Sequence, residues 1–298
     1  MGTGTGRGES VVVCTYAVGA PLYFSAMRET VRSALRHTSF DVLAMVGTDC
    51  AIALPSHPRF RPISLSAAPA LHRSQRFLLK FLALRSCLEH SAADFVLYLD
   101  ADAVFARRVS ARDVSTALEG RELGMVEQNP PPGSPHGRAF FHDHYRHHTR
   151  PWLGARDEAP PLDVFRFFNS GVVLARRAAL SQICDWTLAE IDRRGPVHQV
   201  GEHMIADQDY LQFWANEIRP DCAASLDWSW NHCEHWHGGF PRRGVRVAHL
   251  SNACHGPTRR NIWRLRALSV APGIERSWRR LRAARTRLRG DAAGAASG

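Results

Sequence analysis

The sequence predicts an α/β protein in which helices cover both faces of a sheet. Short apolar runs typical of buried strands, such as residues 11–14 and 95–99, alternate along the chain with longer segments whose apolar residues recur at helical spacing. This alternation is typical of a sheet with helices on both faces. The 298 residues, 45% of them hydrophobic, are enough for one large globular domain or two small ones.

The predicted strands are short apolar runs that end at polar or turn residues. In chain order they cover residues 9–16, 42–46, 94–99, 124–127, 167–175 and 246–250. The predicted helices cover residues 23–37, 74–90, 114–118, 177–194 and 207–216. In the helix over 74–90, Phe77, Phe81 and Leu84 recur at helical spacing and are expected to face the core.

In two segments the apolar residues recur with neither helical nor strand spacing. Residues 54–69 are rich in Pro and Ser and predict irregular structure, whereas residues 130–161, with Pro, Gly and many His, predict a long functional loop. The spacing of His142, His144, His147 and His148 would allow a second metal site, although we favour a basic, aromatic lid for an acceptor.

The net charge of +10 comes almost entirely from Arg, because Lys80 is the one Lys of the chain. Such a charge suits anionic partners such as phosphates. Seven Cys without a CxxC pair favour reduced, buried thiols in a cytosol over a disulfide framework or a thiolate zinc site. With no apolar run long enough for a bilayer span and no apolar signal core at residues 1–10, we expect a cytoplasmic location.

The sharpest local pattern is the apolar run 95–99 followed by Asp100-Ala101-Asp102. Residues two apart on an extended chain point to the same side. Two carboxylates at the carboxyl end of a buried strand suit a divalent cation that phosphates also bind. A helix cap or a turn is the alternative reading for such a pair.

Other polar side chains stand at the ends of predicted elements. His249 ends an apolar strand and would complete a mixed oxygen and nitrogen site for Mn²⁺ or Mg²⁺, although a His there is often structural. Asn169 and Ser170 precede an apolar run and could hold sugar hydroxyls, or form an ordinary turn. Asp207 and Gln208 open a helix, where the acid could cap it or face a reacting centre. Arg76 and Lys80, one turn apart, could reach an anion together or form a solvated face.

Six short motifs follow one another in an order that resembles the retaining glycosyltransferases of the GT-A fold, and most closely family 8, the glycogenin-like enzymes. They are Lys80, Asp100-Ala101-Asp102, Phe168-Asn169-Ser170-Gly171, Asp207-Gln208, Trp230-Asn231 and His249. The resemblance spans roughly residues 11–260. It implies a mixed, mostly parallel sheet flanked by helices, in one catalytic domain over 1–270 with an acceptor-side loop over 130–161.

The resemblance also implies roles for these motifs. Asp100, Asp102 and His249 would hold the Mn²⁺ or Mg²⁺, and Asp207 and Gln208 would lie beside the anomeric carbon. The residues expected to contact the donor are Thr15, Tyr16, Ala17, Arg76, Lys80, Ala101, Asn169, Ser170 and Arg259. The implied reaction is transfer of a hexose from a nucleotide-diphosphate sugar, expected to be a UDP-hexose, to an unidentified acceptor with retention.

The chain departs from the family pattern after His249. The family continues with HxxGxxKPW, whereas here Gly256 and Arg259 keep the GxxK-like spacing after an insertion. Arg259 would then bind phosphate in place of Lys. His255 becomes a rival metal ligand, and we prefer His249 because it ends a strand.

Two other classes of function stay open at this point. A sugar nucleotidyltransferase would also combine carboxylates, a metal and a nucleotide, but it would release pyrophosphate. A non-catalytic module that binds an anionic polymer would explain the charge but not the carboxylates at a strand end, so we expect no nucleic-acid partner. The basic helix expected over 274–289, within a C-terminal region 271–298 with a disordered tail, is either a solvated face or a peripheral membrane contact.

Overall fold

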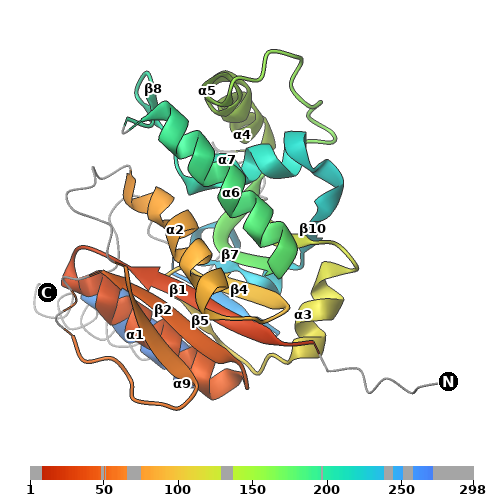
Figure 1. Cartoon of the computed structure of the whole chain (residues 1–298). Helices are drawn as coiled ribbons and strands as arrows, with labels where there is room; N and C mark the ends of the chain where they lie inside the picture. Colours follow the sequence, from red (N-terminus) through yellow and green to blue (C-terminus); the bar gives the residue numbers. More distant parts are fainter. Residues whose placement is uncertain are drawn as a thin grey trace, which may run out of the picture.

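A computed structural model describes residues 9–47, 50, 52–65, 75–128, 137–195, 197–237, 244–250 and 258–270. Its centre is a seven-stranded sheet with the order β10-β6-β7-β4-β1-β2-β3. Strand β7 (Phe168–Arg176) is antiparallel to both of its neighbours, β4 and β6, whereas the other pairs of adjacent strands are parallel. The predicted fold class, a mixed and mostly parallel sheet flanked by helices, is therefore confirmed (Figure 1).

The other strands of this sheet are β1 (Val11–Ala17), β2 (Asp41–Gly47), β3 (Phe60–Leu65), β4 (Phe95–Leu99), β6 (Leu123–Glu127) and β10 (Ala223–Leu226). The principal helices are α1 (Pro21–His37), α2 (Gln75–His90), α3 (Ala111–Leu118), α6 (Arg177–Arg194), α7 (Asp207–Phe213) and α9 (Arg259–Val270). Most of these elements lie within two residues of the predicted ranges. Among the described helices, none combines the length and the apolar character that a bilayer span requires.

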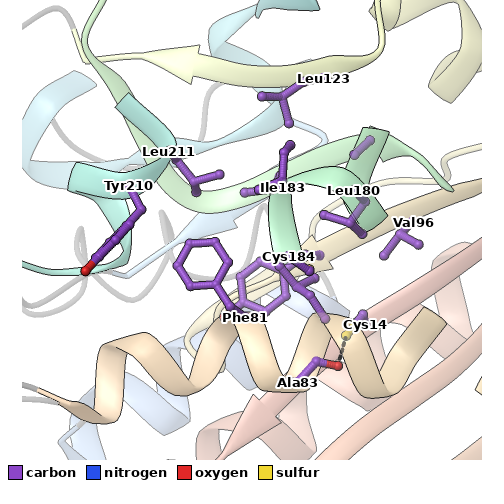
Figure 2. Close-up of a cluster of buried hydrophobic side chains, with 14 of the residues drawn as sticks. Cys14, Phe81, Ala83, Val96, Leu123, Leu180, Ile183, Cys184, Tyr210 and Leu211 are labelled. Carbon is purple, nitrogen blue, oxygen red and sulfur yellow. Dashed lines mark hydrogen bonds between the residues drawn. The ribbon is translucent and has the colours of Figure 1, made fainter. Parts of the chain in front are cut away.

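Alternate residues of β1 enter two separate cores. Val11 and Val13 pack with side chains of α1, such as Phe24, on one face of the sheet. Val12 and Cys14 face the opposite core, which α2, α6 and α7 cover. Figure 2 shows this second core, in which the Cys14 thiol lies against the backbone of Ala83 on α2. Because both faces of the central strands are buried, they read in the sequence as continuous apolar runs.

A second, three-stranded sheet has the order β11-β12-β5, with β5 (Ala103–Phe105), β11 (His232–Cys233) and β12 (Val247–His249). It begins directly after Asp102, and its β5 strand packs against α1. In this sheet β12 runs antiparallel to β5 and parallel to β11. The small sheet therefore brings the end of β4 and the end of β12 to one place.

Three expectations from the sequence are wrong. Residues 60–65 form β3 rather than irregular structure, and Pro62 is tolerated because β3 is the edge strand of the large sheet. The expected loop 130–161 contains a helical segment made of α4 (Arg138–His144), the π-helical turn η1 (Tyr145–Thr149) and α5 (Arg150–Leu153). Phe77 is 45% exposed, whereas Phe81 and Leu84 are buried as expected.

Candidate active site

Asp100, Asp102 and His249 converge at the junction of the two sheets. Each offers one ligand atom, and these atoms all lie within 4.8 Å of one another. His249 Nε2 is 3.2 Å from Asp102 Oδ1 and 3.8 Å from Asp100 Oδ2. The structure thus brings the aspartate pair and His249, which are far apart in the sequence, to one place. Together they form the mixed oxygen and nitrogen ligand set expected for Mn²⁺ or Mg²⁺. His255, the rival ligand, lies outside the described residues.

The ladder between β5 and β12 sets the relative position of these side chains. His249 pairs with Ala103, the residue directly after Asp102. The amide of Leu250 donates to the Asp102 carbonyl at 3.0 Å, which extends the ladder by one bond. Backbone hydrogen bonds, rather than side-chain contacts alone, therefore hold the imidazole beside the carboxylates.

Gly171 on β7 makes room for the His249 ring. A Cβ at position 171 would lie 2.1 Å from His249 Cε1 and 2.5 Å from His249 Nδ1. Real Cβ atoms do not approach other atoms so closely, so any side chain at this position would displace the imidazole or the strand. The glycine of the Phe168–Gly171 motif is thus explained by packing against a candidate metal ligand.

Hydrogen bonds determine which His249 nitrogen carries a proton and which one can offer its lone pair to a metal. The Gly171 amide, which can only donate, bonds to the Asn169 side chain at 2.8 Å, so the Asn169 atom at this contact is Oδ1. That oxygen also accepts from Asn231 Nδ2 at 2.7 Å, which turns Asn231 Oδ1 toward His249 Nδ1 at 3.0 Å. Nδ1 must then carry the proton, and Nε2 is the nitrogen that can bind a metal. A ligating His commonly donates its other N–H to a fixed acceptor in this way.

The charges of the site suit a cation. Burial raises the pKa of Asp102, but the His249 ring outweighs it and holds the net pKa below the ordinary value. Burial lowers the pKa of His249, whereas Cys233 and Asp102 raise it to a net value well above the ordinary one. Without a cation, the His249 ring is therefore a protonated imidazolium that neutralises the negative charge of Asp102. A bound metal would displace the proton on the imidazole nitrogen that it binds.

Lys80 joins the carboxylates to α7. Its Nζ is 3.2 Å from Asp100 Oδ1, forms a close ion pair with Asp207, and donates to the Ser170 carbonyl at 2.9 Å. Only 2% of Lys80 is exposed, so the ammonium depends on these partners for the solvation that it loses. Burial lowers its pKa, but Asp100 and Asp207 outweigh burial and raise it. Lys80 is therefore charged.

Asp207 is the first residue of α7, and Gln208 is the second. Asp207 is buried, which raises its pKa despite the opposing effect of Lys80. The capping contact that the sequence suggested for Asp207 belongs to Asp209, whose carboxylate accepts from the Ala206 amide at 2.9 Å. Gln208 donates to Gln128 at 2.9 Å. Asp207 is thus held against Lys80, which links it to Asp100 of the candidate metal site.

Two tyrosines flank the carboxyl end of β4. The Tyr98 hydroxyl donates to Asp100 Oδ1 at 2.6 Å, and its ring lies 4.8 Å from Lys80 Nζ. Tyr16 stacks on Tyr98 with ring centroids 6.2 Å apart and donates to the Arg76 carbonyl at 3.0 Å. Tyr98 was not singled out in the sequence, because a Tyr inside an apolar strand is typical of a core residue.

The remaining predicted site residues occupy different positions. Thr15 and Ala17 are buried on β1, and Thr15 Oγ1 has no hydrogen-bond partner among the described residues.

Arg76 is exposed, and its guanidinium lies over Gly19, which adopts a positive φ of 84°. The Ala101 carbonyl accepts from Thr30, and Arg259 is the exposed first residue of α9. The region 271–298 lies outside the described residues.

Solved structures of the galactosyltransferase LgtC are similar to this chain. An active-site mutant of LgtC shares 14% sequence identity at a TM-score of 0.49, over 86% of this chain and 94% of that one. LgtC in complex with donor and acceptor sugar analogues shares 14% identity at a TM-score of 0.47, over 87% of this chain and 95% of that one. No protein-family model and no curated protein matches the chain.

Proposed function

We propose that this protein is a metal-dependent glycosyltransferase that moves a hexose from a nucleotide-diphosphate sugar, a UDP-hexose, to an acceptor with retention of configuration. One observation carries the proposal: two carboxylates and an imidazole converge, and hydrogen bonds at Nδ1 turn Nε2 of the imidazole toward the carboxylates, where it can bind a metal. An Asp pair with a single His resembles a site for a cation that a diphosphate also binds, more than it resembles a structural zinc site.

Asp100, Asp102 and His249 would hold Mn²⁺ or Mg²⁺. When bound there, such an ion supplies positive charge to the diphosphate and acts as a Lewis acid toward the leaving nucleoside diphosphate. The chain's own contribution is to orient these three ligands through the β5–β12 ladder and the Asn169–Asn231 link. Lys80 keeps one further positive charge beside Asp100, at the side of the site that faces α7.

Asp207 and Gln208 are our candidates for the residues beside the anomeric carbon. Asp207 is buried and forms an ion pair with Lys80, which also lies beside Asp100, so Asp207 would be held close to a diphosphate bound at the metal. For the donor, Thr15, Tyr16 and Ala17 at the end of β1 remain candidates for the nucleotide. Asn169 and Ser170 are candidates for the sugar, and Arg76, Ala101 and Arg259 for the diphosphate.

A panel of nucleotide sugars, tested with and without Mn²⁺, examines this proposal. We expect one donor to raise the melting temperature only when Mn²⁺ is present, and to be hydrolysed slowly to the free sugar and a nucleoside diphosphate. The variant Asp102→Asn should lose both effects, whereas Asp157→Asn, which changes an exposed carboxylate elsewhere, should keep them. Release of pyrophosphate would instead indicate a nucleotidyltransferase. Unchanged turnover in Asp102→Asn would remove the metal site from the proposal.

A further inference from the structure

Three histidines cluster away from the Asp100 site. A ring nitrogen of His144, one of His148 and one of His203 all lie within 4.8 Å of one another. The ring centroids of His148 and His203 are 3.6 Å apart, and those of His144 and His148 are 5.1 Å apart. The proposed glycosyl transfer uses none of these residues.

The fold brings this cluster together from two separate segments. His144 ends α4 and His148 lies in η1, so the two rings, four positions apart, point from one side of a continuous helical segment. His203 opens β9 (His203–Met204), which pairs with β8 (Gln199–Val200) in a small hairpin. The spacing in the sequence had suggested that His142, His144, His147 and His148 form one metal site. In the structure, His203 joins His144 and His148, whereas His142 and His147 do not belong to the cluster. His142 instead contacts the Pro160 carbonyl at 2.8 Å.

We propose that His144, His148 and His203 bind a divalent transition-metal ion of the zinc class. Three imidazoles with a fourth position left to water form a common zinc site, and imidazole suits Zn²⁺, Cu²⁺ and Ni²⁺ better than Mg²⁺. From Zn–N bonds of about 2.0–2.1 Å, ligating nitrogens in a tetrahedral site lie roughly 3.3 Å apart. The three ligand atoms lie within 4.8 Å of one another, and the exposed His203 side chain would move to close the cluster to that size.

The surroundings of His148 and His144 support a metal. His148 Nδ1 is buried and has no hydrogen-bond partner among the described residues, which is costly unless a ligand satisfies it. Asp209 Oδ1 lies 3.3 Å from His144 Nε2 and also accepts from Thr149. A carboxylate behind a ligating His orients the ring and increases its affinity for metal.

An ion in this cluster would join the helical segment 138–153 to the hairpin of β8 and β9. That hairpin directly precedes α7, whose first residue is Asp207. The metal would therefore brace the predicted acceptor side of the protein next to the candidate reacting centre, without taking part in binding the donor.

Titration with Zn²⁺ alone tests the proposal in the Asp102→Asn background, which disables the other candidate metal site. Competition with a chromogenic chelator should give one tight equivalent of Zn²⁺. Co²⁺ should give the visible spectrum of tetrahedral nitrogen coordination. His203→Ala should weaken binding by at least about 100-fold, because losing even an outer-shell partner of a zinc ligand costs about 10–100-fold.

His147→Ala is the matched control, since it removes an exposed imidazole from the same helical turn and should leave the affinity unchanged. His148→Ala should repeat the loss seen with His203→Ala. The absence of a tight equivalent, or equal affinities in His203→Ala and His147→Ala, would overturn the proposal. No nucleotide sugar enters this experiment, so its outcome is independent of the proposed glycosyl transfer.

Discussion

The Lys80 ammonium forms an ion pair with Asp207, the residue that opens α7, and the same ammonium lies 3.2 Å from Asp100. One buried cation therefore connects a candidate metal ligand to the candidate reacting centre. Because Lys80 is the one Lys of the chain, no other ammonium side chain can replace it.

Replacing Lys80 with Met should strongly destabilise the protein. The change leaves Asp100 and Asp207 near each other without their shared cation, and removing one partner of a buried ion pair costs about 3–5 kcal/mol. Urea unfolding at pH 7 measures this loss. The double variant Lys80→Met with Asp207→Asn should recover part of the stability, because it removes one of the two stranded carboxylates. Arg76→Met, at an exposed position one turn away, should have little effect. Additive losses in the double variant would contradict this assignment.

Substituting Gly171 with Ala should weaken metal binding. The new methyl group would lie within 3 Å of both His249 and Asn169 Oδ1, so the imidazole must leave its position. Overpacking of this kind costs about 1–3 kcal/mol. Isothermal titration with Mn²⁺ and urea unfolding should show both losses together. The matched control is Gly137→Ala, because a Cβ at Gly137 meets no atom within 4 Å. Full Mn²⁺ affinity in Gly171→Ala would show that His249 is not a ligand.

Two substitutions at Asn231 should differ in their effect on Mn²⁺ affinity. Asn231→Leu removes the acceptor for His249 Nδ1–H and should lower Mn²⁺ affinity by about 10–100-fold. Asn231→Asp keeps an acceptor for the imidazole, so it should retain metal affinity, but it places a carboxylate against Asn169 Oδ1 and should lose stability. Nitrogen chemical shifts of His249 report the tautomer directly. Equal Mn²⁺ affinities of the two variants would refute the proposed hydrogen-bond relay.

The metal-free protein and Mn²⁺ binding should respond to pH in opposite directions. The pKa of His249 is raised in the folded state, so its contribution to stability is complete below its unfolded pKa, about 6.5, and is lost as pH rises through the folded pKa. A metal must displace that proton, so the apparent Mn²⁺ affinity should increase up to about tenfold per pH unit between pH 6 and 8. Titrations in buffers of different ionisation enthalpy should detect about one released proton. His249→Gln should abolish this proton release, and its persistence there would assign the proton to another group.

Much of the fold was predictable because buried strands such as β1, β4 and β7 read as apolar runs and the long helices keep their period. The errors have local causes. β3 contains Pro62 and lies at the sheet edge, and the helical segment 138–153 is hidden by His residues and by Pro151. Asp100, Asp102 and His249 were recognisable from their positions at strand ends. The burial of Lys80 and the bond between Asn169 and Asn231 were not, because they depend on tertiary neighbours that no local pattern records.

The pairing of β12 with β5 also bears on when the proposed metal site can form during synthesis of the protein. Translation releases the chain from its N-terminal end at about 5–20 residues per second, so both aspartates leave the ribosome well before His249 does. A nascent chain that stops short of β12 carries the two carboxylates without their nitrogen partner. Metal capture at the proposed centre would therefore wait until β12 has been made, and it would mark the closure of the strand pairing with the largest sequence separation among the described residues.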